Sequence, residues 1–302
     1  MANLVVLVVC FALGIALRRS GRLPPEAHKV LNAFVVNVAL PALILRHVHE
    51  LRYDGQLLFP AAMPWVMFAL GALFFAALGR AAGWSRRTTG GLMLSGGLAN
   101  TSFVGLPMIE AFYGPAFLGV GVLADQLGSY LVLSTVGVLV AAVCSSAGPV
   151  SAAAVARKVA AFPPFQAVLL SAALAPLDYP EAAVAVLDRL AATVTPLALV
   201  SVGYQLSLGG IAGRLRELSA GLFYKLALGP ALVAALFVFA LNGTGKVVEV
   251  TVFEAAMGPM IGGAIVAMDH GLDPPLVTLM VGLGIPVSLV TAALWSVLLG
   301  GI

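Results

Sequence analysis

The chain alternates long runs of apolar residues with short segments rich in charged residues, proline and glycine. A helix needs about 20 predominantly apolar residues to cross a lipid bilayer, and most of the runs approach or exceed that length. The pattern therefore predicts an all-α integral membrane protein with ten transmembrane helices. Their predicted ranges are 3–17, 30–48, 57–79, 88–113 and 116–145 in the first half, and 163–177, 181–208, 216–242, 246–271 and 274–301 in the second.

Composition agrees with this interpretation. Of the 302 residues, 61% are hydrophobic and 10% are charged, whereas about 25% of the residues in an ordinary soluble domain are charged. Ten membrane spans leave little chain for a soluble domain. The net charge of +3 comes from basic residues between apolar runs, without a patch of interleaved aromatic residues, so no nucleic-acid partner is expected.

Basic residues collect on one side of the predicted layout. Lys and Arg are enriched in cytoplasmic loops, so we expect a multi-pass protein of the bacterial cell inner membrane, with both termini in the periplasm. Eleven basic residues lie on the predicted cytoplasmic side (Arg18, Arg19, Arg22, Lys29, Arg80, Arg86, Arg87, Arg157, Lys158, Arg214 and Arg216), three on the other side (Arg46, Arg52 and Lys246), and two within spans (Arg189 and Lys225).

The two halves of the chain share short matches in the same order. Leu40-Pro41 in predicted helix 2 corresponds to Thr195-Pro196 in helix 7, Pro107-Met108-Ile109 in helix 4 to Pro259-Met260-Ile261 in helix 9, and Leu127-Gly128 in helix 5 to Leu283-Gly284 in helix 10. Duplicated units are common in secondary transporters. The matches predict two five-helix repeats, 1–150 and 151–302, which are inverted because five is odd.

Predicted helices 4 and 9 are poor continuous helices. Pro107 and Pro259 remove a backbone donor and clash with the carbonyl four residues earlier, which frees the carbonyls of Phe103 and Ala255. Such breaks persist in a membrane where they are buried or line a cavity. Half-helix N-termini at these breaks would favour a carboxylate. The candidate substrate-binding residues are Asn100, Thr101, Ser102, Pro107, Gly258 and Pro259. The alternative is that the prolines only kink the helices and the small residues allow close packing.

These motifs together resemble the auxin efflux carrier family, as a bacterial member. The resemblance covers nearly the whole chain and rests on Leu31–Phe34, Leu40–Leu43, Asn100–Thr101, Gly105–Pro107, Tyr113–Gly114, Pro196–Leu199, Gly203 and Pro259–Pro274. It implies a fold shared with bile acid symporters and some sodium/proton antiporters, in which helices 4 and 9 cross at their broken centres. Helices 1, 2, 6 and 7 would form a scaffold and a homodimer contact, and helices 3–5 and 8–10 a mobile core.

The resemblance also implies a place for the substrate. Asn100, Pro107 and Pro259 match the crossover at which related carriers bind it. Two departures argue against auxin itself: Met260 replaces a polar residue of the plant carriers, and the loop between helices 5 and 6 is short.

Ionisable residues within the predicted spans form a second set of candidates. A charge in the bilayer costs at least about 2.5 kcal/mol on insertion scales unless it is paired or hydrated. Asp125 and Glu254 are candidates for carrying a coupling proton or sodium ion, and Lys225 for neutralising one of them or attracting the anion. The alternative is that they are structural polar groups, satisfied by neighbouring helices. We also predict that Asp188 pairs with its neighbour Arg189 near a helix end.

The sequence therefore predicts a secondary active transporter of a small organic anion, a mono- or dicarboxylate that is auxin-like or malate/malonate-like, working by alternating access at the crossover. Alternatives are a sodium-coupled bile-acid-type symporter and a membrane receptor or channel that does not transport. An enzyme is not expected, because the chain has no His-Glu-x-x-His or Gly-x-Ser-x-Gly motif. No cofactor or metal site is expected either.

Overall fold

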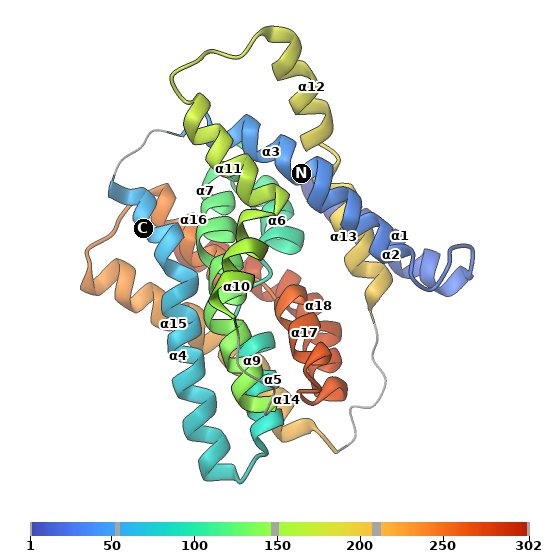
Figure 1. The fold of residues 1–302 in the computed structure, drawn as a ribbon, viewed down its shortest axis with the longest axis vertical. Coiled ribbons are helices and arrows are strands. Elements are labelled where there is room, and N and C mark those ends of the chain that lie inside the picture. The colour runs from blue at the N-terminus through green and yellow to red at the C-terminus, as the bar shows by residue number, and fades with distance from the viewer. Residues whose placement is uncertain (1, 52–54, 146–150, 207–212, 301–302) are drawn as a thin grey trace.

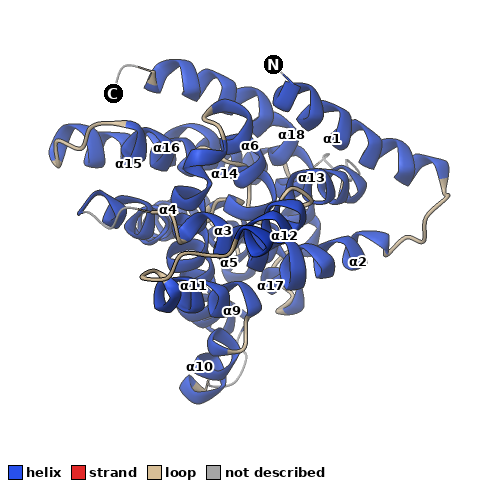
Figure 2. Cartoon of the chain, turned by 90° about the horizontal axis from the view of Figure 1, so that it is seen from above, coloured by secondary structure: helices blue, strands red, loops and turns tan. Residues whose placement is uncertain are grey.

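The structure is a computed structural model that describes residues 2–51, 55–145, 151–206 and 213–300. Arg52 and the predicted helix ends at 207–208 and 301 lie outside the described residues. Regular structure in the described part is helical (Figure 2). Figure 1 shows α12 at one end of the long axis and the turn between α4 and α5 at the other.

The described elements follow the predicted spans closely. The first half contains α1 (Ala2–Ser20), α2 (Ala27–Phe34), η1 (Val35–Ala39), α3 (Leu40–Val48), η2 (Gly55–Leu57), α4 (Leu58–Ala82), α5 (Arg86–Gly96), η3 (Thr101–Gly105), α6 (Leu106–Phe112), η4 (Pro115–Phe117), α7 (Leu118–Leu123), η5 (Ala124–Ser129), α8 (Tyr130–Val132), η6 (Leu133–Gly137) and α9 (Val138–Ser145). The second half contains α10 (Ala152–Ala160), α11 (Pro163–Leu174), α12 (Glu181–Ala191), α13 (Val194–Gln205), α14 (Leu215–Phe223), η7 (Tyr224–Leu228), α15 (Gly229–Ala234), η8 (Ala235–Ala240), α16 (Lys246–Ala255), α17 (Ile261–Asp269) and α18 (Pro274–Leu299).

Within the described residues, seven helical stretches are long and apolar enough to cross a membrane: Asn3–Ser20, Ala27–Val48, Gly55–Ala82, Pro115–Ser145, Glu181–Gln205, Leu215–Ala240 and Pro274–Leu299. The other three predicted spans correspond to the short helix α11 and to two interrupted helices. The first interrupted helix comprises α5, η3 and α6, and the second comprises α16 and α17. The structure adds one helix that the apolar runs did not predict, the amphipathic α10.

The two interruptions lie against each other. Residues 97–100 separate α5 from η3, and residues 256–260 separate α16 from α17. The backbone N–H of Asn100 donates to the carbonyl of Gly258 at 2.9 Å, and Ala99 forms an isolated antiparallel bridge with Pro259. The two non-helical stretches therefore pair some of each other's backbone groups. Such pairing is needed because buried backbone N–H and C=O groups must be hydrogen-bonded.

The prolines act differently in the two interrupted helices. In the second, the carbonyl of Ala255 is free of the helix as predicted, and the ammonium of Lys225 donates to it at 2.7 Å. In the first, Pro107 follows the π-helix η3 at the second residue of α6, and the helix continues through it. The predicted break near Phe103 was therefore misplaced: residues 101–105 form a π-helix, and the interruption precedes Asn100.

Within the described ranges, six π-helical segments widen the long helices, namely η1, η3, η5, η6, η7 and η8. Such segments are rare and frequently occur at functional sites. Three of them carry the polar residues at the centre of the molecule: η3 carries Thr101 and Ser102, η5 carries Asp125, and η7 carries Lys225. Four of the predicted site residues, Thr101, Ser102, Asp125 and Lys225, therefore lie in π-helical segments.

Candidate substrate cavity

A cavity of about 270 Å³ begins at the interruption that precedes Asn100 and extends to α10 and α11. Its walls are mostly apolar, and a group of polar residues, Asn100, Ser102, Asp125 and Gln126, lies near the interruption. The lining residues are Asn32, Val36, Leu40, Asn100, Ser102, Phe103, Asp125, Gln126, Tyr130, Leu133, Ser134, Val138, Lys158, Phe162, Met260, Ile261, Gly262, Ile265 and Val266. A site with one polar end and apolar walls fits a small organic molecule better than a hydrated ion.

Asn100 stands at the polar end of the cavity and is 3% exposed. Its side-chain oxygen accepts a hydrogen bond from the backbone N–H of Phe103 at 3.2 Å, which caps the helix that starts at Thr101. Its amide nitrogen is buried and has no hydrogen-bond partner among the described residues. A buried donor that lacks a partner costs free energy, so a ligand acceptor at this position would relieve the cost.

Asp125 lies beside Asn100 and is almost completely buried. Thr101 and Ser102 donate their hydroxyls to Oδ1 of Asp125 at 2.5 and 2.9 Å. The amide of Gln126 donates to Oδ2 at 2.6 Å. Both carboxyl oxygens are therefore acceptors, and the donors come from η3 and from η5 itself.

Glu254 and Lys225 lie behind the cavity and are fully buried. In the part of the chain that the structure describes, neither carboxyl oxygen of Glu254 has a hydrogen-bond partner. The carboxyl packs where Gly105 and Gly121 have no side chains, and a Cβ at Gly105 would overlap it. Lys225 donates to the carbonyl of Ala255 and approaches the sulfur of Met67 at 4.0 Å. Glu254 is close enough to feel the charges of both Asp125 and Lys225.

The amino-acid sequence of the chain matches a known protein family. A sequence model described as "Membrane transport protein" matches it twice, over residues 1–148 and 149–296. The chain belongs to the membrane transport protein family. This confirms the resemblance to auxin efflux carriers that its motifs indicated.

Two archaeal relatives of this transporter carry names that agree with the family. An uncharacterized transporter of Methanothermobacter thermautotrophicus is 26% identical over 296 residues, which cover 97% of this chain and 96% of the relative. An uncharacterized transporter of Methanocaldococcus jannaschii is 26% identical over 287 residues, covering 91% of each chain.

The transporter brings only some of its predicted site residues to the cavity. Asn100, Ser102 and Asp125 line it. Thr101 instead uses its hydroxyl on Asp125. Pro107, Gly258 and Pro259 shape the backbone around the interruptions and are not among the lining residues, and Glu254 and Lys225 lie behind the wall.

Several lining residues were not predicted. Tyr130 stacks on Phe162 with ring centroids 4.0 Å apart, and its hydroxyl donates to the carbonyl of Lys158 at 3.2 Å. Gln126 contributes a second amide. A polar residue directly after Asp125 in an apolar span was a usable signal for Gln126. No sequence signal connected Tyr130 to residues about 30 positions away.

Polar contacts also hold the opposite end of the molecule. Thr195 of α13 donates to the carboxyl of Glu110 in α6 at 2.5 Å, and Asn3 of α1 donates to the carbonyl of Glu110 at 3.1 Å. Asp188 pairs with Arg46 at 2.7 Å. The predicted pairing of Asp188 with Arg189 is therefore wrong, because neighbouring residues of α12 point in different directions and α3 supplies a better placed guanidinium.

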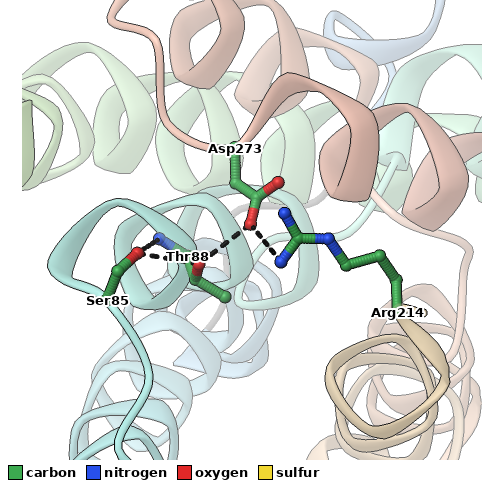
Figure 3. Close-up of polar contacts among 4 residues, drawn as sticks. All are labelled: Ser85, Thr88, Arg214 and Asp273. Atoms are coloured by element: carbon green, nitrogen blue, oxygen red, sulfur yellow. Dashed lines mark hydrogen bonds and ion pairs between the residues drawn. The ribbon is translucent and has the colours of Figure 1, made fainter.

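A separate polar cluster lies outside the cavity (Figure 3). Asp273, just before α18, accepts a hydrogen bond from the hydroxyl of Thr88 at 2.8 Å and forms an ion pair with Arg214 at 3.2 Å. Ser85 caps α5 by accepting from the backbone N–H of Thr88 at 3.0 Å. The cluster joins the starts of α5, α14 and α18.

Proposed function

We propose that this transporter is a secondary active carrier of a small organic anion, which binds at the contact between the two interruptions. The observation that carries the proposal is the Asn100 amide, a buried donor without a protein partner at the polar end of the cavity. Ile261 and Gly262, the first residues of α17, line the same cavity. Amides in a first helical turn have no intrahelical acceptor and favour an anion.

The walls of the cavity bear on the kind of anion. Away from the interruptions the lining is mostly apolar, with Val36, Leu133, Ile265 and Val266 among its members, but it also includes Ser134 and Lys158. A carboxylate buried against such residues without a partner is strongly unfavourable. We therefore favour an acid with a compact apolar body, either a monocarboxylate or a dicarboxylate whose second carboxylate reaches Lys158. Lys158, the basic side chain among the lining residues, would attract an anion to the far end of the cavity.

Size bears on the bile-acid alternative. Ligand pockets commonly enclose about 300–1,000 Å³, and this cavity holds about 270 Å³. A rigid steroid is a poor fit for this volume, whereas a small acid fits. Sodium coupling is a separate question that cavity size leaves open.

For the mechanism we propose alternating access between two inverted repeats, 1–150 and 151–302. The two family matches, 1–148 and 149–296, support a duplicated chain. Among the described helices, one group consists of α1 and α2, which pack on α13, and of α11 and α12, which pack on α3. The other group consists of α4, α5 and α9, which pack with η5, α16, α17 and α18. These two groups correspond to a scaffold and a core, with the cavity between them.

We further propose that the carrier resides in a bacterial inner membrane as a homodimer joined through its scaffold helices. In this conformation the cavity extends toward Lys158, which the basic-residue pattern places on the cytoplasmic side. At the opposite end, Glu110 of the core is held to Thr195 of the scaffold.

Counterflow in proteoliposomes tests the proposed function. Vesicles loaded with an unlabelled monocarboxylate should accumulate the labelled acid transiently, because a carrier exchanges ligand across the membrane whereas a channel or a receptor does not. A panel of aromatic and aliphatic mono- and dicarboxylates supplies the candidates, and empty vesicles supply the control. Absence of counterflow with every acid, in protein that remains folded, would overturn the proposal.

A further inference from the structure

Two buried carboxyl groups lie close to each other in opposite surroundings. Asp125 accepts three hydrogen bonds, from Thr101, Ser102 and Gln126. Glu254 accepts none and is fully buried. Both lie against η3, Asp125 at its first two residues and Glu254 at its last, Gly105. The same short segment therefore separates two groups with different protonation requirements.

The surroundings of Asp125 suit the ionised form. The amide nitrogen of Gln126 donates to Oδ2 of Asp125. Two hydroxyls donate to Oδ1. A carboxylate that accepts several hydrogen bonds is stabilised in its charged state.

The surroundings of Glu254 suit the neutral form. An ionised carboxylate in a dry site requires hydrogen-bond donors or a paired cation, and costs far more than a neutral carboxyl without them. The charged groups of the described chain that face Glu254 are Asp125 of η5 and Lys225 of η7. On its own helix, Lys246 and Glu249 pair with each other at 2.6 Å.

Charge balance points the same way. The ammonium of Lys225 offsets one carboxylate only, so Asp125 and Glu254 cannot both be ionised without leaving a net negative charge in the protein interior. Asp125 has the donors. The neutral arrangement that matches these hydrogen bonds is an ionised Asp125, a charged Lys225 and a protonated Glu254.

We propose that Glu254 is a proton-binding site of this carrier, with its carboxyl protonated in the present conformation while Asp125 stays ionised beside the cavity. Lys225 controls release of the proton. Its ammonium now donates to the carbonyl of Ala255, the residue that follows Glu254. Moving from that carbonyl to the adjacent carboxylate would stabilise ionised Glu254 and free its proton. The use of this proton in transport rests on the function proposed above, whereas the existence of the site does not.

Infrared spectroscopy of the full-length protein tests the site without any transport substrate. A protonated carboxyl gives a carbonyl-stretching band that an ionised one lacks. At neutral pH the wild type should show this band, and carbon-13 labelling of glutamate, but not of aspartate, should shift it. The band should be lost in Glu254→Gln and retained in Asp125→Asn. Absence of the band in the wild type, its persistence in Glu254→Gln, or a response to labelled aspartate would overturn the proposal.

A second variant covers the case in which Glu254→Gln does not fold. Glu254→Asp keeps a carboxyl at the site, so the band should then respond to labelled aspartate in place of glutamate. A band that still follows the glutamate label belongs to another residue and contradicts the assignment.

Transport separates this inference from the proposed function. In Glu254→Gln, the stimulation of uptake by an imposed pH gradient, expressed relative to counterflow in the same variant, should be lost. Stimulation that survives in this variant contradicts a coupling role for the proton. If the wild type shows no counterflow with any acid, the proposed function fails, and the infrared band still decides whether Glu254 holds a proton.

Discussion

The carboxamide of Asn100 uses its two ends for different purposes, and this allows them to be separated by mutation. Its oxygen caps the helix that starts at Thr101, and its nitrogen has no protein partner. Asn100→Ser keeps a capping oxygen and removes the amide donor. We expect this variant to fold normally and to bind the transported acid more weakly by about 1–3 kcal/mol, or about 5- to 150-fold.

Thermal-shift titration with the acid identified by counterflow measures both effects, because a ligand that binds the native state raises the melting temperature. Asn100→Ala should lose the same affinity and also about 1 kcal/mol of stability from the missing cap. Ser85→Ala provides the matched control, since Ser85 caps α5 outside the cavity. It should lower stability and leave affinity unchanged. Wild-type affinity in Asn100→Ser would remove Asn100 from the site.

The sequence showed which polar residues lie within the spans, but not which side chains contact one another. Asn100, Asp125 and Glu254 stand out because polar groups are rare within apolar spans. Which donors reach which acceptors depends on how helices far apart in the chain pack, as the pairing of Asp188 with Arg46 shows. The stacking of Tyr130 on Phe162 was unpredictable for the same reason.

Among the helices, close approach depends on glycine at the contact between α1 and α13. Gly14 of α1 faces the backbone of Val200 and Tyr204, and Gly203 of α13 faces the carbonyl of Phe11. Small residues at membrane helix contacts let two backbones approach closely. Gly14→Val should therefore force α1 away from α13 and destabilise the protein by about 1–3 kcal/mol.

Thermal unfolding in detergent measures the effect of Gly14→Val. Ala16→Val is the matched control, because Ala16 lies two residues further along α1 and is exposed. It should unfold close to the wild-type temperature. Equal stability of the two variants would show that the glycine contact does not hold α1 in place.

The cluster around Asp273 predicts an order of effects for two substitutions at the starts of core helices (Figure 3). The hydrogen bond from Thr88 is buried, so Thr88→Val should cost about 1–3 kcal/mol. The Arg214 side chain is 38% exposed, and exposed ion pairs contribute less than about 1 kcal/mol. Arg214→Gln should therefore cost less than Thr88→Val. Chemical denaturation of both variants gives the comparison, and the reverse order would show that the ion pair dominates.

The position of a helix break was harder to predict than its existence. Glycine and proline marked both interrupted helices in the sequence, and the structure interrupts both. In the second, Pro259 lies within the interruption. In the first, the run from Gly97 to Asn100 leaves the helix, while the π-helix from Thr101 to Gly105 widens the helix before Pro107. Proline rules alone did not distinguish these outcomes. They do not show whether a helix is interrupted at a proline or widens into a π-helix that accommodates it.

For the whole molecule, cysteine labelling can determine toward which side of the membrane the cavity extends. The basic-residue pattern places Arg157 on the cytoplasmic side and Asp178 on the periplasmic side, and both residues are exposed. We expect a membrane-impermeant thiol reagent applied to intact cells to label a cysteine at Asp178 and not one at Arg157. The background protein should carry serine in place of Cys10 and Cys144, which are free and partly exposed.

After the cells are opened, both engineered cysteines should react, which controls for accessibility. Lys158, at the far end of the cavity from the interruption, is adjacent to Arg157, so the expected pattern also assigns the present conformation to the state in which the cavity extends toward the cytoplasm. In that state the hydrogen bond between Glu110 and Thr195 lies on the periplasmic side, and under the proposed alternating access it would have to break for the carrier to open outward. Labelling at Arg157 alone in intact cells would reverse the orientation and place both chain termini in the cytoplasm.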